Sequence, residues 1–228
     1  MAPLALRHAL SALMLLWPVA VWGQSIQGGA AFLYGGQSLW PGSATAIQQV
    51  SQITEPIGND RFILIGAEAY YRRNRWLFGV NASALANKRV YDAATRTTIE
   101  SSASNAHLWI GWVAWQTKRT KLYPSLGPGI NAFNVNATDD SKALTTYVID
   151  GFATDIGLTF DWLVAQAATD PRLQAGPLLS LRAGYRITTA PTPWHNDRTG
   201  TAMPSAGRFS PHGFYLTLGI GGGGFRSR

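Results

Sequence analysis

The sequence has 228 residues, which is long enough for one sizeable domain. Only 14% of the residues are charged, well below the roughly one quarter that is usual in soluble domains. The chain has no cysteine, which excludes disulfides, thiolate metal sites and a cysteine nucleophile. Its interior has no apolar run long enough for a transmembrane helix, so we expect the apolar surface to be carried by another kind of structure.

The first segment has the pattern of a secretory signal peptide. Arg7 and His8 form a basic start, residues 9–21 form a short apolar core, and small residues at 21–23 supply a cleavage site. We therefore expect residues 1–23 to be a signal peptide and the protein to be exported; an uncleaved anchor helix is the alternative. Export argues against nucleic acid as a partner in spite of the net charge of +7.

Eight later segments alternate apolar and polar side chains with the period of a β-strand. In 155–164, for example, Ile156, Leu158 and Phe160 fall on one face, and Asp155 and Thr159 fall on the other. Tryptophans lie on both faces of 106–115, so the alternation does not assign the faces there. The eight predicted strands are 28–39, 61–72, 75–87, 103–117, 121–135, 148–165, 173–187 and 212–224.

The connections between these segments alternate between short and long. Short turns are expected after the second, fourth and sixth strands, at 73–74, at 118–120 and at 166–172, whereas the other connections are longer. This pattern is typical of small barrels with short periplasmic turns and larger external loops. We predict that residues 24–228 form one all-β domain, an eight-stranded antiparallel up-and-down transmembrane β-barrel. The polar faces are rich in small residues, which suits a narrow lumen that side chains fill, so we expect it to be plugged.

Charged residues in the middle of the strands all fall on the polar faces. Counting outward from the 166–172 turn places Asp155 nearly opposite Arg182, which predicts a buried ion pair. Stabilisation of the fold is the expected role of these charges, with ion conduction or catalysis as alternatives. The predicted network inside the barrel consists of Glu68, Asp155, Asp161, Arg182 and Arg186.

Aromatic and basic residues gather near the short turns. Tyr71, Trp76 and Trp162 lie on apolar faces there, which predicts a periplasmic aromatic girdle. The basic residues of this end would attract anionic phospholipid headgroups, or they are ordinary solubilising charges. They are Arg72, Arg73, Arg75, Lys118, Arg119, Lys121, Arg172, Arg226 and Arg228, with Asp170 as the only acid.

Two segments carry a resemblance to a known group of proteins. The glycine-punctuated "LYPSLGPGINAF" (122–133) and the closing "GFYLTLGIGGGGF" (213–225) resemble strands of the small outer-membrane β-barrel proteins, the OmpA/OmpX-like group. This resemblance implies a bacterial outer-membrane location. It also implies outer-membrane lipid and lipopolysaccharide as surroundings, and a possible extracellular ligand or protein partner at the long loops.

Three functions remain open from the sequence. The leading hypothesis is a non-enzymatic barrel with a structural or surface-interaction role. The second is a lipid A or phospholipid hydrolase at the barrel rim, with Ser210 and His212 as the reactive pair and Asp197 orienting the histidine. The third is a soluble periplasmic carrier similar to a lipocalin. No cluster of His, Asp and Glu has metal-ligand spacing, so we expect neither a metal nor a cofactor.

Overall fold

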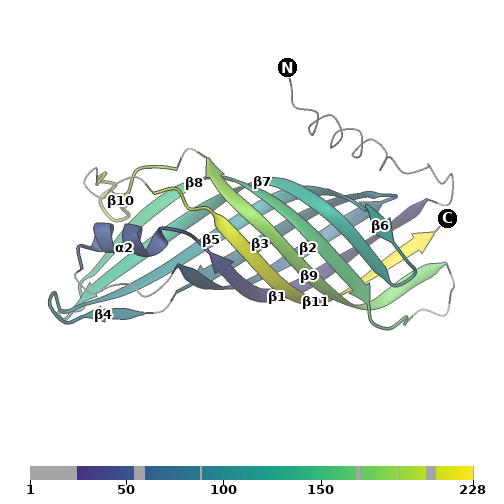
Figure 1. The fold of residues 1–228 in the computed structure, drawn as a ribbon, viewed down its shortest axis with the longest axis horizontal. Helices are drawn as coiled ribbons and strands as arrows, with labels where there is room; N and C mark the ends of the chain where they lie inside the picture. The colour runs from purple at the N-terminus through teal and green to yellow at the C-terminus, as the bar shows by residue number, and fades with distance from the viewer. Residues whose placement is uncertain are drawn as a thin grey trace, which may run out of the picture.

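The strands of the computed structural model form a closed antiparallel β-barrel (Figure 1). The structure describes residues 25–53, 60–87, 89–167, 170, 172–189, 191–203 and 209–227, so the predicted signal peptide, 1–23, and the predicted basic residue Arg228 lie outside the described residues. Long strands pair in chain order, and the first pairs with the last to close the cylinder. The predicted eight-stranded barrel is therefore confirmed. Its strands are β1 (Ile26–Leu39), β2 (Arg61–Arg73), β3 (Trp76–Ala86), β5 (Thr97–Trp112), β7 (Thr120–Asp139), β8 (Leu144–Leu163), β9 (Leu173–Thr189) and β11 (Gly213–Ser227).

The two ends of the barrel differ in their connections. At one end, called the turn end, lie the tight β2–β3 turn and the short β6 (Trp115–Gln116). At the opposite end, called the loop end, lie α2 (Ser43–Ser51), β4 (Val90–Asp92) and β10 (His195–Asn196). Figure 1 places these three elements together, far from β6 and the end of β11. The predicted segregation of long connections to one end is thus present.

Several connections are more structured than the sequence indicated. β7 and β8 extend through most of 136–147 and leave only residues 140–143 between them. The predicted strand 103–117 begins earlier, at Thr97, and ends at Trp112. The 40–60 connection contains α2, which was not predicted because its apolar positions, Ala46, Ile47 and Val50, are few.

The outer wall of the barrel is apolar. On β8, Leu158 is 50% exposed and Phe152 is 71% exposed, whereas the intervening Asp155 is 1% exposed. On β2, the outward positions from Ile63 to Tyr71 carry no charged side chain. We call this surface the outer apolar belt. Its large members include Leu33, Ile65, Val80, Leu108, Ile130, Ile156, Leu158, Leu181 and Leu218.

The lumen has three layers, and apolar side chains fill both of its ends. Trp40, Phe62 and Phe133 belong to the loop-end cluster. Phe32 and Trp109 belong to the turn-end cluster, in which the Trp109 and Tyr123 rings stack with centroids 6.0 Å apart. The polar residues lie between the two clusters. The sequence predicted a polar lumen lined by small residues. This prediction is wrong for both ends of the lumen, where large inward side chains pack against each other.

Helix α2 covers the loop end because its start is held by a distant carboxylate. Asp60, just before β2, accepts hydrogen bonds from the Ala44 N–H at 2.8 Å and the Ser43 hydroxyl at 2.9 Å. An acceptor at this position satisfies backbone donors that have no partner within the helix. The helix then buries Ile47 and Val50 in the loop-end cluster.

Glycines allow close approach at two kinds of position. A Cβ on Gly79 would lie 2.3 Å from the Trp109 ring, so glycine lets this large ring lie flat against the wall. A Cβ on Gly221 would lie 2.0 Å from the Ala31 carbonyl oxygen, across the β1–β11 seam. The glycine-rich closing strand therefore lets the last strand approach the first closely.

Candidate functional site

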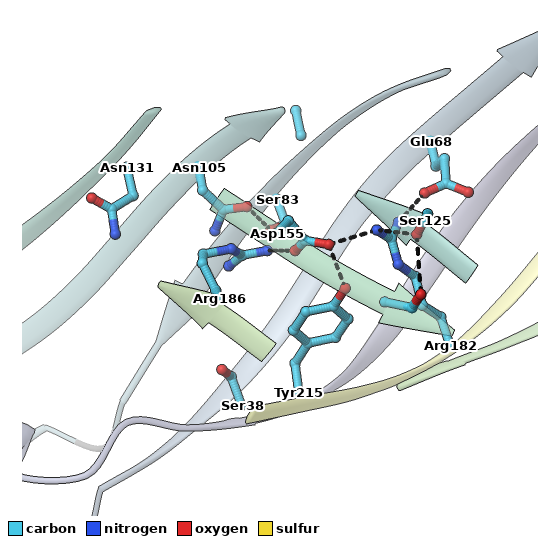
Figure 2. Close-up of polar contacts among 12 residues, drawn as sticks. Ser38, Glu68, Ser83, Asn105, Ser125, Asn131, Asp155, Arg182, Arg186 and Tyr215 are labelled. Atoms are coloured by element: carbon cyan, nitrogen blue, oxygen red, sulfur yellow. Dashed lines mark hydrogen bonds and ion pairs between the residues drawn. The ribbon is translucent and has the colours of Figure 1, made fainter. Parts of the chain in front are cut away.

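The central layer of the lumen is organised around Arg182 on β9 (Figure 2). Its Nη1 donates to Glu68 on β2, across the lumen, and its Nη2 lies 2.7 Å from Asp155 Oδ1 on β8. The side chains of Arg182, Glu68 and Asp155 are all buried. One guanidinium therefore connects three strands of the cylinder.

Asp155 is the second centre of this layer. Besides Arg182, it accepts a hydrogen bond from Arg186 Nη2 at 3.2 Å and from the Tyr215 hydroxyl at 2.7 Å. The residue directly across from Asp155 in the ladder is Arg186, and Arg182 lies across from Thr159. The predicted alignment of Asp155 with Arg182 was therefore wrong by four residues, although the long arginine side chain still reaches the carboxylate diagonally.

Tyr215 is a member of this network that the sequence analysis missed. A Cβ on Gly184 would lie 2.4 Å from the Tyr215 hydroxyl oxygen, so glycine on β9 leaves the space that the phenol occupies. The signal for Tyr215 was present in the alternation, because it shares a face with Gly213 and Thr217.

The charges of the central layer balance. Two carboxylates, Glu68 and Asp155, face two guanidinium groups, Arg182 and Arg186. A buried charge is costly unless it is paired and hydrogen-bonded, and each of these four has a partner. The arrangement therefore fits a closed structural network.

Asp161 lies apart from the other four predicted charges. Its carboxylate lies 3.3 Å from Lys121 Nζ and accepts a hydrogen bond from the Tyr70 hydroxyl at 2.8 Å. The Lys121 ammonium also lies 4.1 Å from the centroid of the Phe225 ring, a favourable cation–π distance. The single predicted network is therefore two networks, and the sequence analysis had assigned Lys121 to the basic turns instead.

Some polar atoms of the lumen have no protein partner in the described part of the chain. They include both ring nitrogens of His107, Asn81 Oδ1, Asn105 Nδ2 and Arg186 Nη1. Buried polar groups of this kind are ordinarily satisfied by internal water. The polar layer therefore keeps several donors and acceptors that hydrogen bonds among the described residues do not use.

The three predicted girdle residues point outward near the turn end. Tyr71, Trp76 and Trp162 are between 42% and 50% exposed. Trp76 is paired across the ladder with Trp112, whose ring lies 5.5 Å from the Arg75 guanidinium. Aromatic and basic side chains thus occur together on this part of the outer wall.

The predicted hydrolase residues lie at the loop end, where they form hydrogen bonds with backbone groups. The Ser210 hydroxyl donates to the Thr188 carbonyl at 2.9 Å, and His212 Nδ1 contacts the Ser210 backbone carbonyl at 2.6 Å. Asp197 is exposed, and its backbone N–H donates to the Thr146 carbonyl. Within the described ranges, no hydrogen bond joins the side chains of Ser210, His212 and Asp197.

Two other features are absent from the described residues. No group of three or more His, Asp or Glu side chains in this part of the chain is placed to hold a metal ion. None of the helices among these residues combines the length and apolarity needed to cross a membrane.

The comparisons with known proteins give only distant similarities. No protein-family model matches the sequence, and a search of curated proteins gives no match. The attachment invasion locus protein Ail of Yersinia pestis is 11% identical, covering 89% of this chain and 99% of its own, with a TM-score of 0.40. A major outer membrane protein of Thermus thermophilus is also 11% identical, covering 88% and 99%, with a TM-score of 0.40.

Neisserial surface protein A is 14% identical, covering 90% of this chain and 96% of its own, with a TM-score of 0.32. The class of the present protein rests on its own strand pairing: it is a closed eight-stranded antiparallel β-barrel with an apolar outer wall and a filled lumen.

Proposed function

We propose that the protein is an integral β-barrel of a bacterial outer membrane, with a structural or surface-interaction role. The outer apolar belt is the observation that carries this proposal. Leu158, Leu181 and Leu218 are each about half exposed or more, while the charges of the same strands are buried in the lumen. This arrangement is the reverse of a soluble barrel, and it is the one that a hydrocarbon surrounding stabilises.

The alternative of a soluble lipocalin-like carrier fits the molecule less well. A carrier needs a polar outer surface and an interior cavity that can hold a ligand. Here the interior positions are occupied by clusters such as Trp40 with Phe133 and Tyr70 with Trp109. The same clusters favour a barrel through which solutes do not diffuse.

The loop end is the part of the molecule that we assign to interactions outside the membrane. Its described part forms a folded cap, because Trp194 and the apolar side of α2 belong to the loop-end cluster. Exposed residues such as Thr45, Lys142 and Arg198 cover its surface. A folded surface can present these side chains to an extracellular ligand or protein at a low entropic cost.

Membrane fractionation followed by gel electrophoresis tests this proposal. The full chain is expected in the outer-membrane fraction, extractable only with detergent, and to migrate differently with and without boiling because the barrel resists unfolding. Recovery in the soluble periplasm, with no effect of boiling on mobility, would contradict the proposal.

Epitope insertion tests which end faces outward. An epitope inserted between Thr199 and Gly200 is expected to bind antibody on intact cells, because this turn is exposed at the loop end. An epitope between Lys118 and Arg119 is the matched control and is expected to bind only after lysis. The opposite result would reverse the assigned orientation.

A further inference from the structure

The exposed basic residues of the turn end form a surface that the proposed function leaves unexplained. One exposed acid, Asp170, lies among them in the described residues. We call these six exposed or half-buried residues the basic rim. They are Arg73, Arg75, Lys118, Arg119, Arg172 and Arg226.

The basic rim differs from the buried bases at the same end. Arg72 donates to the Asn74 carbonyl and to Gln116, each at 2.6 Å, and Lys121 pairs with Asp161. In contrast, no residue of the rim forms an ion pair with an acid in the described part of the chain. The charge of the rim is therefore not neutralised by the protein itself.

The rim lies at the level of the outward tryptophans. The Arg75 guanidinium lies over the Trp112 ring, which keeps Arg75 on the outer wall rather than in the lumen. Trp76 is the ladder partner of Trp112, and the exposed Arg73 is the ladder partner of Trp76. Tryptophans on a lipid-facing surface mark the headgroup level, so the rim meets headgroups rather than hydrocarbon.

The loop end has no comparable excess of positive charge. Its described acids outnumber its described bases, and Arg89 there pairs with Glu100. The bases are Arg61, Arg89, Arg96, Lys142 and Arg198, and the acids are Asp60, Asp92, Glu100, Asp139, Asp140, Asp150 and Asp197. Positive charge is thus concentrated at one end of the barrel.

We propose that the basic rim binds anionic phospholipid headgroups in the leaflet at the turn end. This inference rests on the proposed membrane location and adds a lipid class and a leaflet to it. The attraction between a negatively charged membrane surface and one nearby Lys or Arg changes the affinity for that surface about fivefold. Anionic lipids therefore surround the turn end in preference to zwitterionic lipids.

Spin-labelled lipids in reconstituted vesicles test the proposal. The full barrel is placed in phosphatidylcholine vesicles, and the fraction of motionally restricted label is measured for phosphatidylglycerol and for phosphatidylcholine. The natural sequence is expected to select phosphatidylglycerol, and R73Q/K118Q/R119Q is expected to reduce this selectivity about fivefold at each lipid position that loses a neighbouring charge. These three substitutions keep most of the side-chain length and leave the Arg75–Trp112 contact in place.

The matched control removes three exposed charges at the loop end, in R96Q/K142Q/R198Q. This variant is expected to keep the selectivity of the natural sequence. Sodium chloride at about 1 M is expected to abolish the selectivity, because it shortens the screening length to about 3 Å. Boiling-dependent gel mobility checks that each variant is folded.

Three results would overturn the proposal: unchanged selectivity in R73Q/K118Q/R119Q, an equal loss in the control variant, or displacement of the labelled lipid by millimolar inorganic phosphate. The last result would mean that the rim recognises a free anion instead of a headgroup. A protein that does not enter vesicles at all would instead overturn the proposed membrane location, so the two failures are distinguishable.

Discussion

The inner and outer faces of β8 differ in composition although they alternate along the same 20 residues. The inner face carries Asp155 and Asp161, both nearly inaccessible, and the outer face carries Ile156 and Leu158, each about half exposed. In the central part of β8, the buried positions therefore carry polar side chains that can pair, and the exposed positions carry apolar ones. This comparison supports the proposal that the outer face lies in hydrocarbon.

The largest expected effect comes from breaking the inner face. The R182M substitution removes the guanidinium that bridges Glu68 and Asp155, which leaves the buried Glu68 without its ion pair and Asp155 with Arg186 as its remaining ion-pair partner. We expect the free energy of unfolding to fall by about 3–5 kcal/mol. Denaturant titration of the barrel in lipid vesicles measures it.

The control for this change is L181M, at the neighbouring residue, which points to the outer face. A volume-conserving apolar substitution there is expected to cost less than about 1.5 kcal/mol. Equal stability of R182M and L181M would show that the central charges do not stabilise the barrel.

The next effect comes from placing a charge on the outer face. L158R turns an arginine toward the middle of the outer apolar belt, and we expect a loss of about 2–4 kcal/mol in a bilayer. V164R, just beyond the turn end of β8, is expected to cost about 0–1 kcal/mol, because the charge reaches the interface there. Refolding yield and unfolding in vesicles measure both losses. A larger loss of stability in V164R than in L158R would contradict the assignment of the outer apolar belt.

A smaller effect is expected at the seam that closes the barrel. G221A places a methyl group 2.0 Å from the Ala31 carbonyl oxygen, so β1 and β11 must separate. Overpacking of this kind typically costs about 1–3 kcal/mol. G222A is the control, because its Cβ would lie 3.8 Å from the Gly176 carbonyl oxygen, an ordinary contact distance. A loss of stability that is equal in the two variants would argue against a tight seam.

The smallest effect is expected at an exposed charge of the loop end. The Ser141 hydroxyl donates to the Asp139 carboxylate at 2.6 Å, and this bond, with that from the Ala143 N–H, lowers the pKa of Asp139. We expect S141A to raise the pKa of Asp139 toward its ordinary value. The pKa of Asp139 is lowered only in the folded turn, so the charged carboxylate stabilises the folded state at pH values above its ordinary pKa. This stabilisation is lost as the pH falls through the lowered pKa.

NMR titration of the Asp139 side chain in detergent measures this change. An unchanged pKa in S141A would show that the Ser141 hydrogen bond does not stabilise the carboxylate.

The fold could be predicted from the sequence because most strands alternate strictly. Ile63, Ile65 and Tyr71 on β2, for example, were assigned to the outer face, and the structure places them there. The alternation fails where both faces are apolar: Trp109 points inward and Trp115 outward, and composition alone does not separate them. Helix α2 could not be predicted, since its start depends on Asp60, which lies 16 residues from Ala44.

The charged layer could be predicted in part. The inward direction of Glu68, Asp155 and Arg182 follows from their parity along the strands. Their partners do not, because register depends on the length of the β8–β9 turn and long side chains reach diagonally across the lumen. For the same reason the separation of Asp161 from the central network, and its pairing with Lys121, became visible only in three dimensions.

Spin labelling of single cysteines tests the central claim most directly, and the cysteine-free sequence makes it straightforward. L158C and T159C, neighbouring positions on the outer and inner faces of β8, are labelled with a nitroxide in bilayers. Collisions with oxygen and with a water-soluble nickel complex are then measured. The label at 158 is expected to show frequent oxygen collisions and few nickel collisions, and the label at 159 few of either. Nickel collisions at 158 as frequent as those at the exposed loop position T199C would contradict the account, because the outer wall would then face water.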